Sequence, residues 1–419
     1  MIIRDRDVME AVDKTETKGY LESEFSEENI SDYAEACRDT AWRMVEMIMD
    51  RGREPITVLI PSRGAVPFII GAIKAIKEDP KINKFVKEAF GTENFVELPS
   101  LSCFDVVRDT SEAPGKPLVR MLLLPFTADA SFHGEEVRNE EDLVGDMRRF
   151  MTRVASEILF KAPQKRAGKE FQLYLNFLKE VEGRSGLAQF YEEFQPVKTG
   201  EPVLYIDTVI SGRASDTIVD EFERLGVNIG FRVDSQLVPL LVVDNYGLSL
   251  GPRFRRYVDQ FSATKSVLRV PKILSEDRGA AFLGITAVIY ENLITTATNS
   301  HPECEDLAPY FGAWHDVPSR DAPLFKGVFK QFIELIGQKI SGRDGNFTEK
   351  RREFLSSILK RRILETRDKI GHSETKEFFR SGLPFESARE TGSHIIQIRL
   401  PGSTAESIVS KVCRLSINH

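Results

Sequence analysis

The chain has 419 residues, which is enough for one large core with additions or for more than one domain. Hydrophobic residues make up 41% and charged residues 29%, a balance typical of a globular rather than a disordered chain. The formal net charge of −7 provides no overall attraction to nucleic acid, so only a local basic patch could bind it.

The sequence carries no sign of a membrane or secretory protein. No apolar run reaches the roughly 18 residues needed to cross a bilayer, and the first residues lack the apolar core of a signal peptide. The cysteines lack Cys-x-x-Cys spacing or a disulfide pattern; they are Cys37, Cys103, Cys304 and Cys413. The His, Cys and acidic residues within 301–316 match no regular zinc arrangement. We therefore expect a cytoplasmic protein without a metal held by its own side chains.

Residues 1–55 are acidic at first and then show the spacing of an amphipathic helix. The apolar residues that fall on one face are Tyr33, Ala36, Cys37, Ala41, Met44, Val45 and Ile48. We interpret this segment as an N-terminal helical cap that packs on a sheet or forms part of a lid beside it.

The next segment, Thr57–Ile70, reads as a strand, a polar turn and an apolar helix that runs to about Lys77. Its turn places small residues around one cation, in the order Pro61, Ser62, Arg63, Gly64 and Ala65. Because the Arg63 guanidinium is planar and always charged, it suits a ligand with two adjacent phosphate oxygens. A surface arginine in an ordinary turn is the alternative.

Two β-rich runs follow, Asn94–Phe104 and Leu118–Phe126, and the second is apolar enough for a central strand. Lys116 lies in the turn before this second run, and His133 begins a His-Gly-Glu sequence after it. These two residues are candidates for a mobile loop that closes over a reacting centre, or for ordinary solvated turns. Residues 128–200 are polar and helical in pattern, and we interpret them as a helical insertion.

The most informative segment is Pro202–Val219. Val203–Ile206 is a short apolar run, and the polarity changes at Asp207, so we expect that carboxylate at the carboxyl end of a strand. The turn before the following helix carries mostly small side chains: Ser211, Gly212, Arg213, Ala214 and Ser215. A phosphate could approach the backbone N–H groups there, where the helix dipole also favours an anion. Asp207 could accept hydrogen bonds from two ribose hydroxyls.

This segment resembles the 5-phosphoribosyl 1-pyrophosphate (PRPP) loop of type I phosphoribosyltransferases, in which an apolar strand leads to one or two acids and a short Ser/Thr/Gly/Ala run. Thr208 stands where the family usually has a second acid, and Arg213 stands where it prefers glycine. The segment Pro61–Pro67 resembles the family's pyrophosphate loop, with one inserted serine and with Ala65 in place of a second glycine. The two loops occur in the family's order.

The resemblance implies that PRPP binds with its 5-phosphate beside Ser211–Ser215, its ribose on Asp207 and its pyrophosphate beside Ser62–Ala65. Mg²⁺ would be bound mainly through the substrate. The implied reaction transfers the phosphoribosyl group to a nitrogenous base and releases pyrophosphate, with Asp207 as the candidate catalytic residue. Hydrolysis of a nucleotide or of PRPP, and non-catalytic sensing of either ligand, are the alternatives.

The rest of the chain is less specific. Leu237–Val243 reads as the next strand, in which Pro239 indicates an edge position or an irregular start. Ala280–Ile289 is a further apolar element that is either helix or strand. Two long helices are predicted at Pro323–Lys339 and Phe347–Lys369, and the second is basic. For its basic face we expect solvent or an intramolecular partner rather than nucleic acid; a separate protein partner is a further option.

The sequence therefore predicts an α/β protein with an open twisted, mostly parallel sheet of phosphoribosyltransferase type. The cap covers residues 1–55, the sheet domain covers 56–295 with its insertion at 128–200, and a mainly helical C-terminal extension covers 296–419. The sequence does not indicate an oligomeric state.

Overall fold

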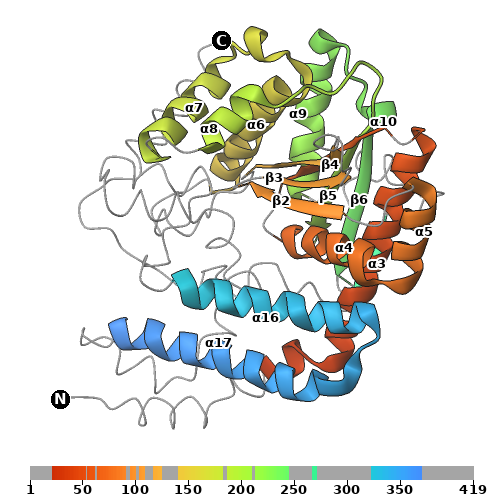
Figure 1. The fold of residues 1–419 in the computed structure, drawn as a ribbon. Helices are drawn as coiled ribbons and strands as arrows, with labels where there is room; N and C mark the ends of the chain where they lie inside the picture. The colour runs from red at the N-terminus through yellow and green to blue at the C-terminus, as the bar shows by residue number, and fades with distance from the viewer. Residues whose placement is uncertain are drawn as a thin grey trace.

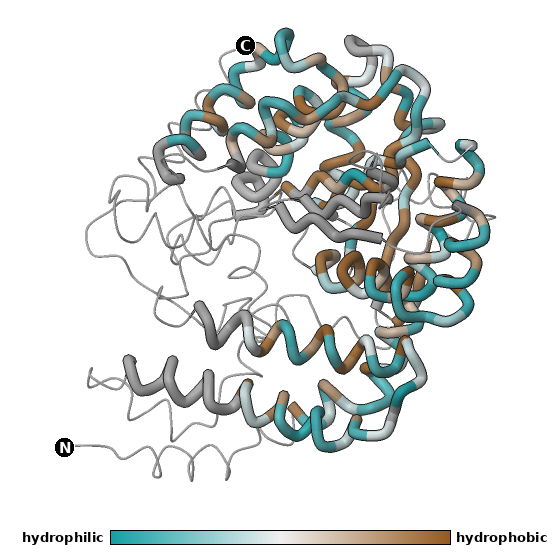
Figure 2. The backbone as a smooth tube through the Cα atoms, viewed as in Figure 1, coloured by the Kyte–Doolittle hydropathy of each residue, from teal (hydrophilic) through white to brown (hydrophobic). Residues whose placement is uncertain are grey.

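The computed structural model describes residues 21–52, 54–61, 64–90, 95–100, 103–108, 117–124, 140–182, 186–209, 213–244, 267–270 and 322–369. These residues form an α/β protein in which a seven-stranded sheet lies between two layers of helices (Figure 1). Hydrophobic residues are concentrated on the central strands and on the inward faces of the helices (Figure 2). The α/β class expected from the sequence is confirmed.

The strands in chain order are β1 (Ile56–Ile60), β2 (Phe95–Ser100), β3 (Cys103–Arg108), β4 (Pro117–Leu123), β5 (Val203–Val209), β6 (Leu237–Asp244) and β7 (Val267–Val270). Their order across the sheet is β2-β3-β4-β1-β5-β6-β7. From β4 to β7 in this order, neighbouring strands pair in parallel. The β2–β3 pair is antiparallel and continues antiparallel onto β4. The sheet is therefore mostly parallel, as the sequence predicts.

Two details of the strands differ from expectation. The run Asn94–Phe104 is not one strand, because Ser100 and Cys103 are opposite each other in the antiparallel β2–β3 register and the chain reverses between them. The edge position that Pro239 indicated is also wrong, since β6 pairs with both β5 and β7. The β7 register begins only at Leu241, so Pro239 needs no N–H on that side.

The helices are α3 (Glu27–Asp50), α4 (Val66–Glu78), α5 (Pro80–Phe90), α6 (Glu140–Phe160), α7 (Lys169–Glu182), α8 (Gly186–Glu193), α9 (Arg213–Ile229), α10 (Val233–Gln236), α16 (Ala322–Ser341) and α17 (Phe347–Lys369). One layer contains α3 and α4 with α16 packed on both and α17 packed on α16; we call it the lower layer, after its place in Figure 1. The other layer contains α6 packed on α7 and α9, with α8 beside α7; we call it the upper layer.

The strand order reverses between β1 and β5. After β1 the chain passes through α4 and α5 to the β2–β3 pair and then to β4, which pairs with one side of β1. β5 pairs with the other side of β1, and the chain continues through α9 to β6 and away from β4. Ligands of open α/β sheets bind beyond the carboxyl ends of strands at such a reversal. The carboxyl ends of β1 and β5 therefore lie where sheets of this kind bind their ligands.

A buried arginine joins the ends of two helices in the upper layer. Arg166 follows the 3₁₀ turn Pro163–Lys165 and is only 5% exposed. Its guanidinium donates to six backbone carbonyl groups near the carboxyl ends of α6 and α8: those of Glu157, Ile158, Lys161, Tyr191, Glu192 and Phe194. Burial lowers the pKa of Arg166 to about 10, so the group remains charged at neutral pH. One cation thus donates to carbonyl groups near the carboxyl ends of both helices, where intrahelical donors run out; the Glu157 carbonyl also accepts from the Lys161 N–H.

An ion-pair network connects α6, α7 and α9. Arg153 of α6 lies 2.8 Å from carboxylate oxygens of both Glu170 on α7 and Glu221 on α9. Glu221 also pairs with Arg224. Burial opposes ionisation of Glu221, but the hydrogen bonds from Arg224 and Arg153 outweigh it and lower the pKa of the carboxyl. Ion pairs and hydrogen bonds between charged side chains therefore help to hold α6, α7 and α9 together.

Aromatic rings join the elements of the lower layer, which include residues from both ends of the chain. The Phe25 ring lies 5.1 Å from that of Phe354 and 6.0 Å from that of Phe332. Tyr33 of α3 stacks on Phe68 of α4 at 3.9 Å and meets Phe332 of α16 edge to face at 5.4 Å. Because all of these rings are buried, the C-terminal helices α16 and α17 share one core with α3 and α4.

Polar contacts surround this aromatic cluster. Arg38 of α3 donates to the carbonyl groups of Lys339 and Ile340 at the end of α16. Arg351 of α17 donates to the carbonyl of Phe25 at 2.5 Å and to that of Glu22 at 2.6 Å. The basic helix α17 thus has an intramolecular partner, as expected for Phe347–Lys369.

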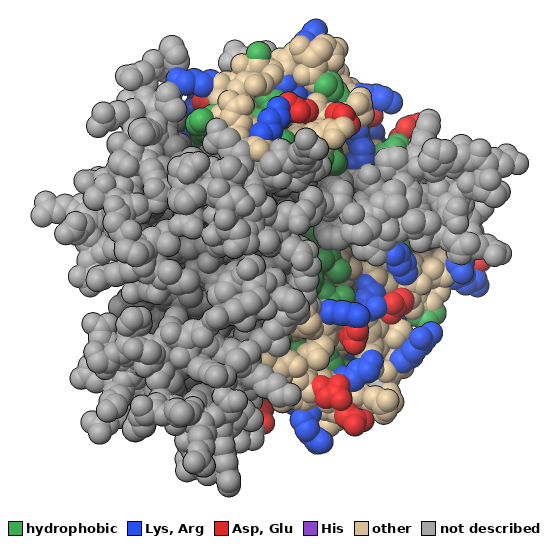
Figure 3. Space-filling view, turned by 60° about the vertical axis from the view of Figure 1, so that its left-hand side comes forward, with side chains coloured by type: hydrophobic (Ala, Val, Ile, Leu, Met, Phe, Trp, Pro, Cys, Tyr) green, Lys and Arg blue, Asp and Glu red, His purple; other side chains and the backbone are tan. Residues whose placement is uncertain are grey.

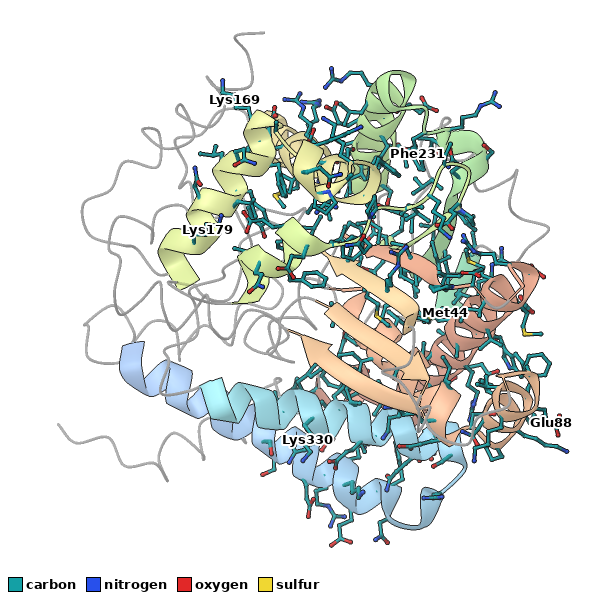
Figure 4. The ribbon with its side chains drawn as sticks, turned by 45° about the horizontal axis from the view of Figure 1, so that its top comes forward. Met44, Glu88, Lys169, Lys179, Phe231 and Lys330 are labelled. Atoms are coloured by element: carbon teal, nitrogen blue, oxygen red, sulfur yellow. The ribbon has the colours of Figure 1, made fainter. Side chains whose placement is uncertain are left out.

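Several charged side chains of the outer helices point outward. In Figure 4, Glu88 of α5 and Lys169 and Lys179 of α7 project away from the sheet. On the face in Figure 3, the described Lys, Arg, Asp and Glu side chains are interspersed rather than gathered by sign. In the described part of the chain, no helix combines the length and apolar character needed to cross a membrane. The element expected at Ala280–Ile289 lies outside the described residues.

Candidate functional site

Strands β1 and β5 are parallel neighbours, so their carboxyl ends point to the same edge of the sheet. Leu59 is opposite Tyr205, and β5 runs on to Val209 beyond the end of β1 at Ile60. The chain enters α4 through Gly64 and Ala65, both buried, and enters α9 at Arg213. The two sequence-predicted loops therefore follow adjacent strands, although about 140 residues separate them along the chain.

Several predicted site residues lie outside the described residues. They are Ser62 and Arg63 in the first turn, Ser211 and Gly212 in the second, and the loop candidates Lys116 and His133. The backbone of Arg213 is described as the first residue of α9, and its side chain is not. The site can therefore be built from Gly64, Ala65, Asp207, Thr208, Ala214 and Ser215.

The amino end of α4 has features of an anion site. Its N-cap residue is Ala65, which has no side-chain oxygen that could accept hydrogen bonds from the first N–H groups of the helix. Pro67 occupies the first turn, where a missing N–H removes no intrahelical hydrogen bond. The α4 dipole points its positive end at the same sheet edge as that of α9. Both helices therefore favour negative charge at this edge.

Strand β5 extends further than the sequence predicts. The change of polarity at Asp207 indicated the strand's end, but pairing continues through Val209, with Asp207 opposite Leu241 and Val209 opposite Val243. Asp207 is 2% exposed and Thr208 is 7% exposed. Ladder pairing to β6 outweighs the low strand propensity of aspartate at this position. Asp207 consequently lies two residues before the end of β5, and its carboxylate is buried.

Two protein hydroxyl groups hold the carboxylate of Asp207. The Tyr205 hydroxyl donates to Oδ2 at 3.0 Å, and the Ser215 hydroxyl donates to the same oxygen at 2.9 Å. All three side chains are buried. Tyr205 can reach Asp207 because residues two apart in a strand project from the same face. Ser215, expected as a phosphate ligand, has its hydroxyl engaged by Asp207 in this structure.

The electrostatics of the cluster keep Tyr205 protonated. Burial raises the pKa of Tyr205 well above its usual value, and the negative charge of Asp207 raises it further. Arg148 of α6 acts in the opposite direction on the same pKa, which places its positive charge close to this cluster. Tyr205 is therefore a hydrogen-bond donor at any physiological pH.

Sequence reasoning missed Tyr205 and Arg148. Tyr205 read as one more apolar residue of a buried strand, although its two-residue spacing from Asp207 was a usable signal. Arg148 had no local signal, because its proximity depends on how α6 packs against α9. Strand alternation thus adds the Tyr205 hydroxyl to the candidate site, and the packing of α6 adds the positive charge of Arg148.

Within the described residues, no group of three or more His, Cys, Asp or Glu side chains gathers where a metal ion could be held. In comparisons with known proteins, no family model, no curated protein and no solved structure matches this chain. What bears on function is therefore the chain's own geometry: two turns, two helix amino ends and one buried carboxylate at a reversal of strand order.

Proposed function

We propose that the chain is a magnesium-dependent phosphoribosyltransferase-like enzyme that binds PRPP at the edge between the turns after β1 and β5. The observation that carries the proposal is the placement of these turns. The two segments that resemble the PRPP and pyrophosphate loops follow adjacent strands at the reversal of strand order. This position is where open α/β sheets bind their ligands, which supports a shared phosphate site.

In this proposal, the 5-phosphate lies at the amino end of α9, beside Ser211–Ser215. The pyrophosphate lies at the amino end of α4, beside Ser62–Ala65, where the Arg63 guanidinium can meet two of its oxygens. Asp207 contacts the ribose hydroxyls between them. The two helix dipoles and the guanidinium together offset the several negative charges of PRPP.

The proposed chemistry is substitution at C1 of the ribose. The bond from C1 to the pyrophosphate oxygen breaks with its electron pair leaving on pyrophosphate, and a ring nitrogen of the acceptor base bonds to C1 and releases its proton to solvent. Mg²⁺ bound to the pyrophosphate oxygens would neutralise charge on the leaving group. The chain's own contribution is to position the two ends of PRPP and stabilise the departing charge.

One observation favours a second candidate, a module that senses PRPP or a nucleotide without turnover. Asp207 is buried beneath two hydroxyl groups, and Thr208 stands where the family usually has a second acid. A site with one sequestered carboxylate could bind the ligand and lack the groups needed to drive transfer.

Calorimetric titrations with PRPP, ribose 5-phosphate and pyrophosphate, each with and without Mg²⁺, test the binding part of the proposal. A coupled assay for released pyrophosphate across a panel of nucleobases then tests transfer. Pyrophosphate release that requires a base supports the transferase, release without a base indicates hydrolysis, and binding without release indicates a sensor. No binding of PRPP under any condition would refute the transferase and the PRPP-dependent forms of the two alternatives.

Arg63→Ala should weaken PRPP and pyrophosphate binding by roughly one to two decades, because a charge-assisted hydrogen bond contributes about 1.5–3 kcal/mol. Ribose 5-phosphate affinity should change little. Arg232→Ala is the matched control, since Arg232 is exposed and lies just before β6 at the opposite edge of the sheet. Equal losses for all three ligands, or no loss, would place Arg63 outside the pyrophosphate site.

A further inference from the structure

We propose that Tyr205 is a positioning residue of the candidate site: its hydroxyl and that of Ser215 hold the Asp207 carboxylate and thereby link strand β5 to the start of α9. The role toward a ligand rests on the proposed function. The link between strand and helix does not, because it depends only on contacts within the chain. Tyr205 itself touches neither the proposed ligand nor its reacting atoms.

The contacts link both ends of the turn. Tyr205 lies in the strand before it, and Ser215 lies in the first helical turn after it. Both hydroxyl groups donate to the same carboxylate oxygen, at 3.0 Å and 2.9 Å. One oxygen atom therefore connects the end of a central strand to the start of the helix that would receive the 5-phosphate.

Burial of all three side chains favours a single orientation of the Asp207 carboxylate. Tyr205 is fully buried, Ser215 is 1% exposed and Asp207 is 2% exposed, so water does not compete for the two hydrogen bonds. Rotating Asp207 away would leave a buried phenol and a buried serine hydroxyl without their acceptor. The raised pKa of Tyr205 keeps its proton in place as a donor. The carboxylate is thus held in one orientation before any ligand arrives.

A preorganised carboxylate loses less conformational freedom when it binds ribose hydroxyls, so it binds them more tightly than a mobile one. Tyr205 should consequently affect ribose-containing ligands and not pyrophosphate alone. A tyrosine that only filled space in the core would not discriminate between these two ligands. This difference separates positioning from a merely structural role.

Tyr205→Phe keeps the ring and removes the hydroxyl. We expect it to weaken ribose 5-phosphate and PRPP binding about tenfold while leaving pyrophosphate affinity unchanged, as measured by calorimetry. In an Asp207→Ala background the same change should have no further effect on either ribose ligand. Tyr174→Phe, which removes a hydroxyl from an equally buried tyrosine on α7, is the matched control and should change none of the affinities. Unchanged ribose 5-phosphate affinity in Tyr205→Phe, or equal losses for all three ligands, would overturn the proposal.

Amide hydrogen exchange of residues 208–216 separates this inference from the proposed function. If the wild-type protein binds none of these ligands, the proposed function is refuted, and with it the role of Tyr205 in ribose binding. The exchange measurement alone then tests the link between β5 and α9. Faster exchange in Tyr205→Phe than in Tyr174→Phe would support the link, and equal exchange would overturn it. Should Tyr205→Phe fail to fold, Ser215→Ala removes the other donor and is judged by the same exchange measurement.

Discussion

Both helical layers that enclose the sheet combine aromatic and polar contacts, but they differ in where the arginines lie: Arg38 and Arg351 lie around a buried aromatic cluster in the lower layer, whereas Arg166 is itself buried in the upper layer. In the upper layer, Arg166 and Arg153 make directional polar contacts between elements. In the lower layer, stacked and edge-to-face aromatic rings join α3, α4, α16 and α17. Hydrogen bonds require particular distances and angles, whereas apolar burial tolerates small shifts. The buried carboxylate cluster of the candidate site joins Asp207 and Tyr205 of the sheet to Ser215 of α9, a helix of the upper layer.

This contrast suggests a division of roles. The lower layer gains stability roughly in proportion to the apolar area it buries. The upper layer incurs the desolvation cost of buried charged groups, and in return its helices are fixed in register. Directional polar contacts of this kind suit positions that must hold a ligand group within a fraction of an ångström. Substitutions in the two layers should therefore differ in how much they lower the free energy of unfolding and in whether they also change ligand affinity.

Replacing the buried cation of the upper layer should have the largest effect. Arg166→Met keeps much of the side-chain volume but removes the arginine hydrogen bonds to six carbonyl groups, and we expect a loss of about 4 kcal/mol in the free energy of unfolding. Urea unfolding followed by circular dichroism measures it. Lys165→Met, at the exposed neighbouring position, should change stability by less than about 0.5 kcal/mol. Similar values for the two variants would remove Arg166 from the contrast between layers.

Truncating the lower layer should cost slightly less and should not affect ligand binding. Phe332→Ala removes a fully buried ring that contacts rings of Phe25, Tyr33 and Phe354, so we expect a loss of about 3 kcal/mol. Phe85→Ala is the control, since that ring is 40% exposed and should contribute about 1 kcal/mol or less. A large fall in PRPP affinity in folded Phe332→Ala would show that the two layers do not divide stability from positioning.

The smallest effect should come from Glu221 and should depend on pH. Because the folded-state pKa of Glu221 is lowered from 4.5, its ionised form stabilises the fold above that pH, and this contribution is lost as pH falls through the folded pKa. Glu221→Gln should therefore cost about 1 kcal/mol at pH 7 and show a shallower fall in stability below pH 4.5 than wild type. Glu193→Gln, on the exposed face of α8, provides the comparison. Parallel pH profiles for wild type and Glu221→Gln would contradict the network's role.

The elements with strong periodicity could be predicted from the sequence. The apolar spacing that begins at Tyr33 marks the buried face of α3, and the apolar run from Leu118 is an interior strand. The helices at Pro323–Lys339 and Phe347–Lys369 match α16 and α17 closely. These signals are local, because the side chains of one turn or one strand are enough to decide which face is buried.

Other features depend on partners distant in the chain. The end of β5 was placed at Asp207 by local polarity, but pairing with β6 extends the strand to Val209. Nothing near Arg166 in the sequence shows that it will meet carbonyl groups at the end of α8. The composition of each turn separately predicts phosphate binding, and only the strand order shows that the two turns follow adjacent strands. Whether Asp207, Arg63 and their neighbours bind PRPP stays a prediction.

The sharing of one aromatic core by α3 and α16 has a consequence for biosynthesis. Phe68 and Phe332 belong to the same cluster, yet about 260 residues separate them along the chain. At roughly 5–20 residues per second, a ribosome needs on the order of 10 to 50 s to make that length. During this interval the apolar faces of α3 and α4 are without the helices that finally cover them. A nascent chain paused before α16 should therefore be a chaperone substrate, and it should lose that property once α17 has emerged.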